Sequence, residues 1–483
     1  MVKIEISGKS LILKTTEQLL EMIRNYFSVE KKRVDHNDPF AATRDYAITL
    51  GGSFHVGLLQ EVKDFLIENS IPFTVSPDAE KRFSTPIMVD SIEPVNGIEY
   101  RDYQEETIKK MLSTGRGIAE LPTSAGKTAV MAGFCKTYRK HRNGKILILV
   151  PNNLLLYQAK KDFEDFGVEG VSLFSGETKD DTDWSCPIII ASYMMITQKK
   201  KTKEPLVAKR PYKWLKKFKK FDVVIVDEVH QLSNKDNSIL KFVANCETTN
   251  KFGMTGTVPD DLIPRWTVVG RVGPVIYKKS SAELREVGFI TQVRIKIFEF
   301  PHQYVPMAVT KDDPPTKAYT DEKEYLMNNK KRNSYLVQIC QKAQNNVLVI
   351  VDRIEHGEIL ESYLNKHCSD KIIYFAWGKT PSEEREEIKR MMENNDNIVC
   401  VAIAKLFSTG VSIKNLPWVI LTGIGKSKIQ LLQTIGRALR LHDNKKIATI
   451  FDMADDTHYS YTHLLQRIEY YEREKIDYTY KKI

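Results

Sequence analysis

The sequence has none of the marks of a disulfide-bonded, zinc-binding or membrane-spanning chain. Its 483 residues include six cysteines, all far apart, and none lies in a CxxC pair or in a His/Cys cluster with zinc spacing. No apolar run approaches the roughly 20 residues that cross a bilayer, and the N-terminus lacks the apolar core of a secretory signal. We therefore expect reduced thiols, no membrane association and a cytoplasmic location.

Acidic residues are scarce in one segment only. The net charge is +10, and the stretch from Gln198 to Phe221 carries eleven Lys/Arg against one Glu, which leaves 61 basic and 61 acidic residues elsewhere. A local basic patch is typical of a nucleic-acid path, but a solvated lysine loop would have the same composition. The sequence leaves both interpretations open for this segment.

The pattern of apolar residues predicts an α/β fold in several domains. Residues 1–95 predict a small α/β unit, with a strand pair at the start, helices at 16–27 and 57–69, and a strand followed by a turn at 71–80. Two longer regions then alternate short strands with helical segments, and a charged tail, helical to about residue 475, ends the chain. The strands expected in the longer regions are 145–150, 187–192, 221–227 and 251–256, then 346–352, 371–376, 397–404, 418–423 and 445–453.

These strands are apolar at nearly every position. Such runs predict strands that are covered on both faces, as in a parallel α/β sheet. The helix after 371–376 carries its own start signal, because Thr380 can cap it, Pro381 suits its first position and Glu383 completes a capping box.

The stretch LPTSAGKT, residues 121–128, ends like a phosphate-binding loop. Gly126 permits close approach of the backbone, Lys127 suits the β and γ phosphates, and Thr128 offers a hydroxyl to Mg²⁺. The first glycine of the general pattern is replaced by Leu121. Taken alone, the stretch is also compatible with a chance Gly-Lys-Thr on a turn.

About one hundred residues later, an apolar strand ends in Asp227 and Glu228. Open α/β sheets bind ligands at the carboxyl ends of their strands. Phosphoryl transfer to water needs one carboxylate to hold Mg²⁺ and another group to orient the water. Asp227 suits the first role and Glu228 the second, so the loop and this pair together predict a nucleoside triphosphatase.

The second long region contains QTIGRALR, residues 433–440, which places Arg437 and Arg440 on one face of a predicted helix. Arginine is the permanently charged group that stabilises charge on a transferring phosphoryl group. A surface pair of arginines would be commoner in isolation, so the interpretation depends on the order and spacing of all the motifs.

The complete set of motifs resembles that of the superfamily 2 helicases, in which two RecA-like domains close on ATP. In that superfamily the first position of motif I is commonly not glycine, which removes the objection to Leu121. The matching segments are the adenine-contacting segment at 100–104, motif I at 121–128, Ia at 150–158, II at 227–230, III at 255–257, V at 408–416 and VI at 433–440. Motif V departs from the family pattern, because Thr409 stands where an acidic residue is common.

The resemblance implies the site residues, with ATP and Mg²⁺ as cofactors and Thr128 and Asp227 on the metal. His230 is expected to couple motif II to motif III. The implied catalytic residues are Lys127, Asp227, Glu228, Gln433, Arg437 and Arg440. The implied nucleotide-binding residues are Arg101, Gln104, Pro122, Thr123, Ser124, Ala125, Gly126, Lys127, Thr128, His230 and Gly410.

The implied fold is α/β, with two tandem RecA-like parallel-sheet domains after a small α/β N-terminal domain. The expected boundaries are 1–95 for the N-terminal domain, 96–285 and 286–455 for the two RecA-like domains, and 456–483 for a helical tail. The resemblance implies that the N-terminal domain, which has a basic cluster at 31–33, helps to bind branched or duplex DNA. A domain that only packs against and orients the first RecA-like domain is the alternative.

Within the superfamily, residues 54–76 and 270–295 are most similar to the phage UvsW-type recombination helicases. That likeness implies an ATP-dependent helicase that moves 3′ to 5′ and unwinds or branch-migrates forks, Holliday junctions and D-loops. It would act as a monomer on duplex, branched and single-stranded DNA, in the host cytoplasm if a phage encodes it. An RNA helicase, or the motor subunit of a restriction complex, is the alternative.

Overall fold

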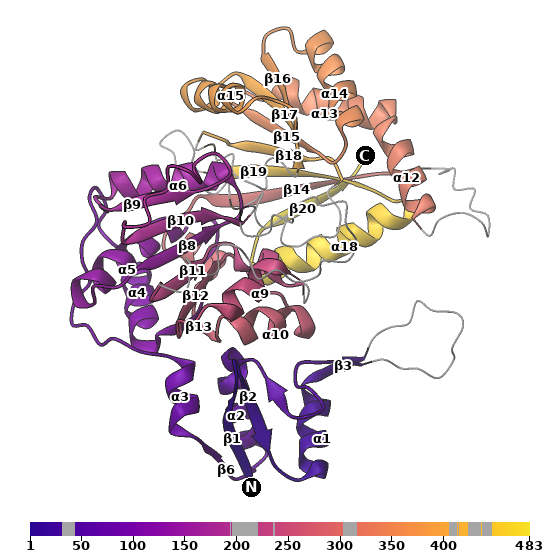
Figure 1. Cartoon of the computed structure of the whole chain (residues 1–483). Helices are drawn as coiled ribbons and strands as arrows, with labels where there is room; N and C mark the ends of the chain where they lie inside the picture. The colour runs from indigo at the N-terminus through magenta and orange to yellow at the C-terminus, as the bar shows by residue number, and fades with distance from the viewer. Residues whose placement is uncertain are drawn as a thin grey trace, which may run out of the picture. The chain divides into compact units, whose positions relative to one another are not determined.

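A computed structural model of the chain, drawn in Figure 1, describes most of its residues. The described residues are 1–30, 44–193, 195, 221–234, 237–302, 316–404, 413, 415–423, 436 and 447–483. Their contacts form two compact units, which are Met1–Leu121 with Gly126–Lys279, and Pro122–Ala125 with Ser280–Ile483. Among the described helices, none has both the length and the apolar character that a bilayer span requires.

The first unit begins with a small mixed sheet of order β5-β2-β1-β6, beside a separate pair of strands, β3 and β4. The strands are β1 (Val2–Ser7), β2 (Ser10–Lys14), β3 (Ser28–Glu30), β4 (Arg44–Tyr46), β5 (Ser53–Phe54) and β6 (Phe73–Val75). The helices are α1 (Glu17–Tyr26), η1 (Val56–Leu58), α2 (Leu59–Glu68) and α3 (Pro77–Phe83). The predicted strand pair and the first two helices are confirmed.

The turn predicted after β6 is wrong, because helix α3 begins there. Ser76 caps the helix by accepting a hydrogen bond from the Ala79 amide, and Pro77 occupies the first helical position. Both features are start signals of a helix. The Ser-Pro pair was therefore interpretable as a helix N-terminus rather than as a turn.

The first large sheet has seven parallel strands in the order β13-β7-β12-β11-β8-β10-β9. The strands are β7 (Arg116–Glu120), β8 (Ile146–Val150), β9 (Val171–Phe174), β10 (Ile188–Ser192), β11 (Val223–Val226), β12 (Asn250–Thr255) and β13 (Val275–Lys278). The helices are α4 (Asp102–Thr114), α5 (Lys127–His141), α6 (Asn153–Asp165), η2 (Val229–Leu232), α9 (Ser238–Asn245) and α10 (Leu262–Arg271). Figure 1 shows α4, α5 and α6 along one side of this sheet and α9 and α10 along another. Strands β8, β10, β11 and β12 are buried at every residue, as the apolar runs of the first three predict, while β12 also buries Asn250, Lys251 and Thr255.

The small sheet and the first large sheet share one apolar core. The Phe27 ring centroid lies 5.5 Å from that of Trp266, on α10. Gly57 of η1 lies so close to α10 that a Cβ atom there would be 2.0 Å from the Val269 carbonyl oxygen. Residues of α2, the central strands and α10 belong to the same cluster of buried side chains. The N-terminal segment thus packs against the α9–α10 face of the large sheet.

The second unit contains another seven-stranded parallel sheet, of order β16-β17-β15-β18-β19-β14-β20. The strands are β14 (Gln292–Phe300), β15 (Val347–Val351), β16 (Ile372–Ala376), β17 (Ile398–Ile403), β18 (Trp418–Leu421), β19 (Ile447–Asp455) and β20 (Tyr478–Lys482). The helices are α11 (Ser281–Glu286), α12 (Lys317–Met327), α13 (Lys330–Lys342), α14 (Ile354–His367), α15 (Ser382–Asn394) and α18 (His458–Arg473). The two parallel sheets confirm the predicted fold class.

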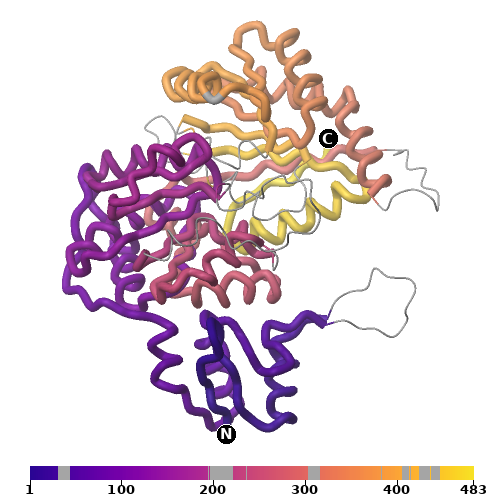
Figure 2. Tube along the Cα trace, in the orientation of Figure 1, coloured from indigo at the N-terminus to yellow at the C-terminus, as the bar shows by residue number. Residues whose placement is uncertain are grey.

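Two local features of the second unit differ from the sequence-based prediction. Helix α15 has Pro381, not Thr380, as its N-cap residue. The Thr380 hydroxyl instead accepts a hydrogen bond from the Trp377 amide, 3.0 Å away. After α18 the chain forms strand β20, which pairs with β14, and Figure 2 shows these distant segments side by side. β20 is an edge strand, and its exposed, charged sequence lacks the apolar pattern from which a strand is predicted.

We expect Gly57→Ala to lower the melting temperature by several degrees. The new methyl group would overlap the backbone of α10, and overpacking of this kind costs about 1–3 kcal/mol. Gly51→Ala is the matched control, because a Cβ atom at Gly51 has open space around it. Thermal unfolding followed by circular dichroism would measure both variants, and equal melting temperatures would contradict the close packing of η1 on α10.

Candidate active site

The predicted phosphate-binding loop connects the buried strand β7 to helix α5. Leu121 is fully buried, and its amide donates a hydrogen bond of 2.8 Å to the Thr255 carbonyl, so this position belongs to the core. Ser124 and Gly126 have positive φ angles of 72° and 79°. Gly126 is also the N-cap residue of α5. The loop therefore turns sharply into a helix N-terminus, where backbone amides are available to an anion.

Position 126 favours glycine because its φ of 79° lies in the left-handed region, and the side chain of Gln104 fills the adjacent space. A Cβ atom there would lie 2.4 Å from Nε2 of Gln104. Gln104 is held in turn by the start of α4, where its Oε1 accepts a 3.0 Å hydrogen bond from the Arg101 amide. The residue predicted to read adenine thus lies against the phosphate-binding loop, and Arg101 holds it in place through the backbone.

The acidic pair stands at the carboxyl end of β11. Glu228 has a φ of 47°, and its amide donates to Asp227 Oδ1 over 2.9 Å. Lys127 Nζ lies 3.5 Å from Glu228 Oε1, and both side chains are mostly buried. Burial raises the pKa of Asp227, the charge of Glu228 raises it further, and Lys127 opposes the shift. The pair needs more positive charge than one lysine provides.

His230 connects the acidic pair to the end of β12. Its Nδ1 lies 2.7 Å from Oγ1 of Thr255 and 3.3 Å from Glu228 Oε2. Burial lowers the pKa of His230 below its usual value, so the ring is neutral near pH 7. The imidazole thus lies between Glu228 and Thr255, as a residue that couples motif II to motif III would.

Tyr193 is a site residue that the sequence analysis missed. Its hydroxyl donates to the backbone carbonyl of Asp227, and its side chain is buried. Tyr193 directly follows β10, two strands from β11 in the same parallel sheet. The available signal was this position after an apolar strand, since the carboxyl ends of parallel strands meet at one edge.

The remaining predicted residues divide into two groups. Thr128 lies half-buried in the first turn of α5, next to Lys127. The middle of the loop is described by its backbone, in which the Ala125 amide donates to the Pro122 carbonyl over 3.2 Å, with Thr123 and Ser124 between them. The predicted residues outside the described part of the chain are Gly410, Gln433, Arg437 and Arg440, together with the basic segment 198–220 and the cluster 31–33.

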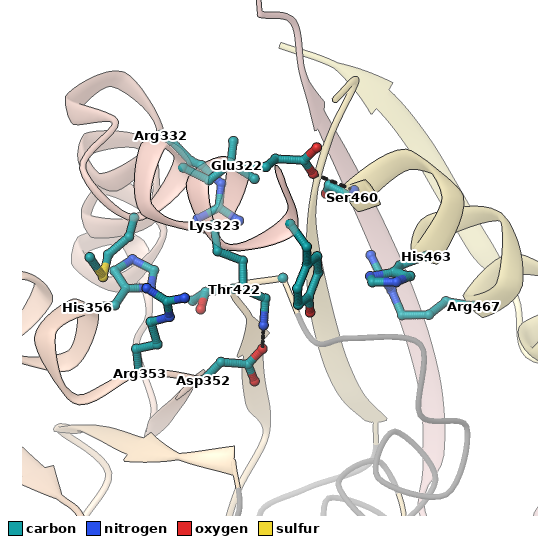
Figure 3. A pocket seen from close by; sticks show the side chains of 14 residues that line it. Glu322, Lys323, Arg332, Asp352, Arg353, His356, Thr422, Ser460, His463 and Arg467 are labelled. Carbon is teal, nitrogen blue, oxygen red and sulfur yellow. Dashed lines mark hydrogen bonds and ion pairs between the residues drawn. The ribbon is translucent and has the colours of Figure 1, made fainter. Parts of the chain in front are cut away.

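A hollow in the second unit, drawn in Figure 3, has a different character. Its cations face carboxylates. The half-buried Lys323 Nζ lies 2.6 Å from Asp352, and the buried Arg332 Nε lies 3.0 Å from the buried Asp455. Glu322 accepts hydrogen bonds from backbone amides at the start of α18. These internal pairs are those of a stabilised polar core.

Two protein-family models match the chain, one in the region of each large sheet. A family model described as "Type III restriction enzyme, res subunit" matches residues 97–260, and one described as "Helicase conserved C-terminal domain" matches residues 331–442. The chain is 30% identical to the ATP-dependent DNA helicase uvsW of Enterobacteria phage T4, over 80% of this chain and 78% of that protein. It is 24% identical to the DNA 3'-5' translocase XPB2 of Sulfurisphaera tokodaii, over 80% of this chain and 87% of that protein.

The solved structure of an ATP-dependent Type ISP restriction-modification enzyme, LlaBIII, bound to DNA has a similar fold. Its TM-score is 0.56 at 13% sequence identity, with 88% of this chain and 34% of that chain covered. At this identity the likeness concerns the fold alone.

We expect Lys127→Ala to reduce nucleotide hydrolysis at least about 100-fold, because the ammonium group beside Glu228 would be lost from a site that already lacks positive charge. Lys136→Ala is the matched control, since Lys136 lies further along the same helix, away from the loop. Steady-state release of phosphate from ATP would measure both. Residual turnover near the wild-type rate in Lys127→Ala would contradict the assignment of the loop.

Proposed function

The chain belongs to the superfamily 2 helicases, and we propose that it uses ATP to move along DNA and to remodel branched DNA such as forks, Holliday junctions and D-loops. The observation that carries this proposal is the position of Lys127 beside Glu228 at the carboxyl edge of the first parallel sheet. The DNA helicase uvsW and the translocase XPB2, which the chain resembles along most of its length, support DNA as the substrate.

Each part of the site has a role in this proposal. Lys127 binds the β and γ phosphates together with the backbone amides of the loop, and Gln104 contacts the adenine. Glu228 orients the attacking water and accepts its proton. His230 lies between Glu228 and Thr255 and couples changes at the bound nucleotide to the end of β12.

Mg²⁺ fits the donors that the site offers. Asp227 and Thr128 would hold the ion, which when bound neutralises charge on the phosphates. The raised pKa of Asp227 indicates that its ionised form lacks positive charge, and a divalent cation would supply it. Within the described ranges no cluster of three or more His, Cys, Asp or Glu side chains could hold a metal. An ion bound through one carboxylate, one hydroxyl and phosphate oxygens needs no such cluster.

The second RecA-like domain completes the chemistry in this proposal. Arg437 and Arg440 stabilise negative charge on the transferring γ-phosphate, and Gln433 and Gly410 contact the same nucleotide. Release of phosphate then removes the contacts that hold the domains closed, so each hydrolysis drives one cycle of opening. DNA is held through its phosphates, which makes binding tolerant of sequence and sensitive to salt. We place the protein in the cytoplasm, as a monomer.

We expect Arg440→Ala to bind ATP about as tightly as the wild type and to hydrolyse it at least about 100-fold more slowly. The arginine would act on the transition state rather than on bound ATP, so kcat should fall without a matching change in nucleotide affinity. Binding of a fluorescent ATP analogue and steady-state hydrolysis would separate the two effects. An unchanged kcat would exclude Arg440 from the reaction.

A substrate panel tests the proposed function itself. Forks, Holliday junctions, D-loops, tailed DNA duplexes and RNA duplexes should be compared for ATP-dependent remodelling and for stimulation of ATP hydrolysis, with Lys127→Ala as the inactive control. We expect branched DNA to be the best substrate and RNA to give little stimulation. Stronger stimulation by RNA, with a requirement for the 2′-hydroxyl, would favour an RNA helicase instead.

A further inference from the structure

A second charged hollow lies in the first unit, at the edge of the large sheet opposite the candidate active site. Arg116 begins β7, Lys251 lies at the start of β12, and the two residues are register partners on these adjacent parallel strands. The same two strands end at the phosphate-binding loop and at Thr255. About five residues of extended strand, roughly 16 Å, therefore separate the hollow from the loop.

The side chains around this hollow carry positive charge and no negative charge. Val56, Ala244, Thr248 and Gly270 also line it, and no carboxylate does so among the residues that the structure describes. The ionisable lining residues are Lys9, His55, Arg82, Arg116, Lys251 and Arg271. We refer to the lysines and arginines among them, Lys9, Arg82, Arg116, Lys251 and Arg271, as the cation cluster. Lys9 and Arg82 come from the N-terminal 83 residues and the other three from the large sheet and α10, so the cluster spans the junction between the two.

The hydrogen bonds of the cation cluster end on neutral oxygens. Lys9 Nζ, the most exposed of these cations, donates to the Asn245 side-chain oxygen over 2.9 Å. Arg271 Nε is buried and has no hydrogen-bond partner within the described residues. The other donors hydrogen-bond to backbone carbonyl oxygens. Arg82 donates to Glu247 over 3.4 Å and Arg116 to Thr249 over 3.1 Å. Lys251 donates to Cys246 and Arg271 to Thr267, each over 3.0 Å.

Burial makes this concentration of like charge costly. Arg116 is 3% exposed and Lys251 is 5% exposed. Burial and the nearby charge of Arg116 lower the pKa of Lys251 to about 7, and burial lowers the pKa of Arg116 to about 9. Burial, followed by the charges of Arg271 and Lys251, lowers the pKa of His55 to about 4. Loss of a proton relieves part of this cost, and a bound opposite charge would relieve the rest.

The hollow of the second unit shows how buried cations are paired elsewhere in the same chain. Its buried cations each have a carboxylate of the same chain, as in the pairs Arg332–Asp455 at 3.0 Å and Arg467–Asp452 at 2.8 Å. No such partner is built into the lining of the first-unit hollow. The missing negative charge there is what a bound anion would provide.

We propose that the cation cluster binds a phosphate group, either a phosphodiester of a DNA backbone or a free phosphate. The three guanidinium groups and two ammonium groups of the cluster can donate hydrogen bonds to an anion that has several acceptor oxygens. The bound phosphate would also tie the N-terminal segment to the first large sheet, because both contribute cations. This site is separate from the nucleotide site and does not depend on ATP hydrolysis.

The first arm of the test measures phosphate binding by thermal unfolding of the full chain. Lys127→Ala serves as the background, so that the phosphate-binding loop contributes little, and sodium phosphate or pyrophosphate is compared with sodium chloride at equal ionic strength. We expect phosphate to raise the melting temperature in a saturable way. Adding Arg271→Gln should weaken the apparent affinity at least about tenfold, because a charged hydrogen-bond donor is lost.

Arg265→Gln is the matched control for that arm. Arg265 lies on the same helix α10, is 44% exposed and pairs with Glu61 outside the hollow. We expect it to leave the phosphate response within about twofold of the background, since a screened surface charge contributes little. If Arg271→Gln does not fold, the exposed Lys9→Gln combined with Arg82→Gln removes two cations from the same hollow and should weaken the response similarly.

The second arm identifies the source of the phosphate. Binding of duplex DNA is measured at several salt concentrations, and loss of one phosphate contact should reduce the slope of log affinity against log salt by about 1. A reduced slope in Arg271→Gln, but not in Arg265→Gln, identifies the DNA backbone as the ligand. A phosphate response with an unchanged slope identifies a free phosphate. Absence of both effects would overturn the proposal, and neither arm requires an active helicase.

Discussion

Two neighbouring carboxylates at the end of a buried strand require positive charge beside them, and the candidate active site is organised around this requirement. Asp227 and Glu228 leave β11 where water is scarce, so their repulsion raises the pKa of Asp227. Lys127 is within 3.5 Å of Glu228 only because β7 and β11 belong to one parallel sheet and end at the same edge. Lys127 offsets only part of this shift, and in the proposed function Mg²⁺ would supply further positive charge.

The same requirement explains how the chain treats its other buried charges. In the second unit, the buried Arg332 and Arg467 each pair with an aspartate of β19. These charges are therefore balanced within the chain, without a ligand. In the first unit, the cation cluster at the opposite edge from the active site has no carboxylate in its lining. This contrast is the basis of the two proposals for the first unit, a cation with nucleotide at one edge of the sheet and an anion at the other.

Much of the fold was predictable because a strand buried on both faces has almost no polar positions. The runs at 145–150, 187–192 and 346–352 therefore appear as β8, β10 and β15 with nearly the expected bounds. Strand β20 escaped prediction, because an exposed edge strand of Tyr and Lys has no such run. Helix α3 differs from the predicted turn for another reason. A Ser-Pro pair can begin a turn or a helix, and here the hydrogen bond from the Ala79 amide to Ser76 belongs to a helix.

For the candidate site, the sequence was enough to predict which groups form it, since Gly126, Lys127 and Thr128 are adjacent and Asp227 is adjacent to Glu228. Residues that are adjacent in sequence stay adjacent in the fold, so motifs of this kind can be recognised without a structure. The distant groups that meet them could be found only from the fold, as with Gln104 against Gly126, Thr255 on His230 and Tyr193 on Asp227. The fold alone also brought Arg271 of α10 to Lys251 and to the N-terminal segment, because strand order and helix packing, not sequence distance, determine which charges share a buried space.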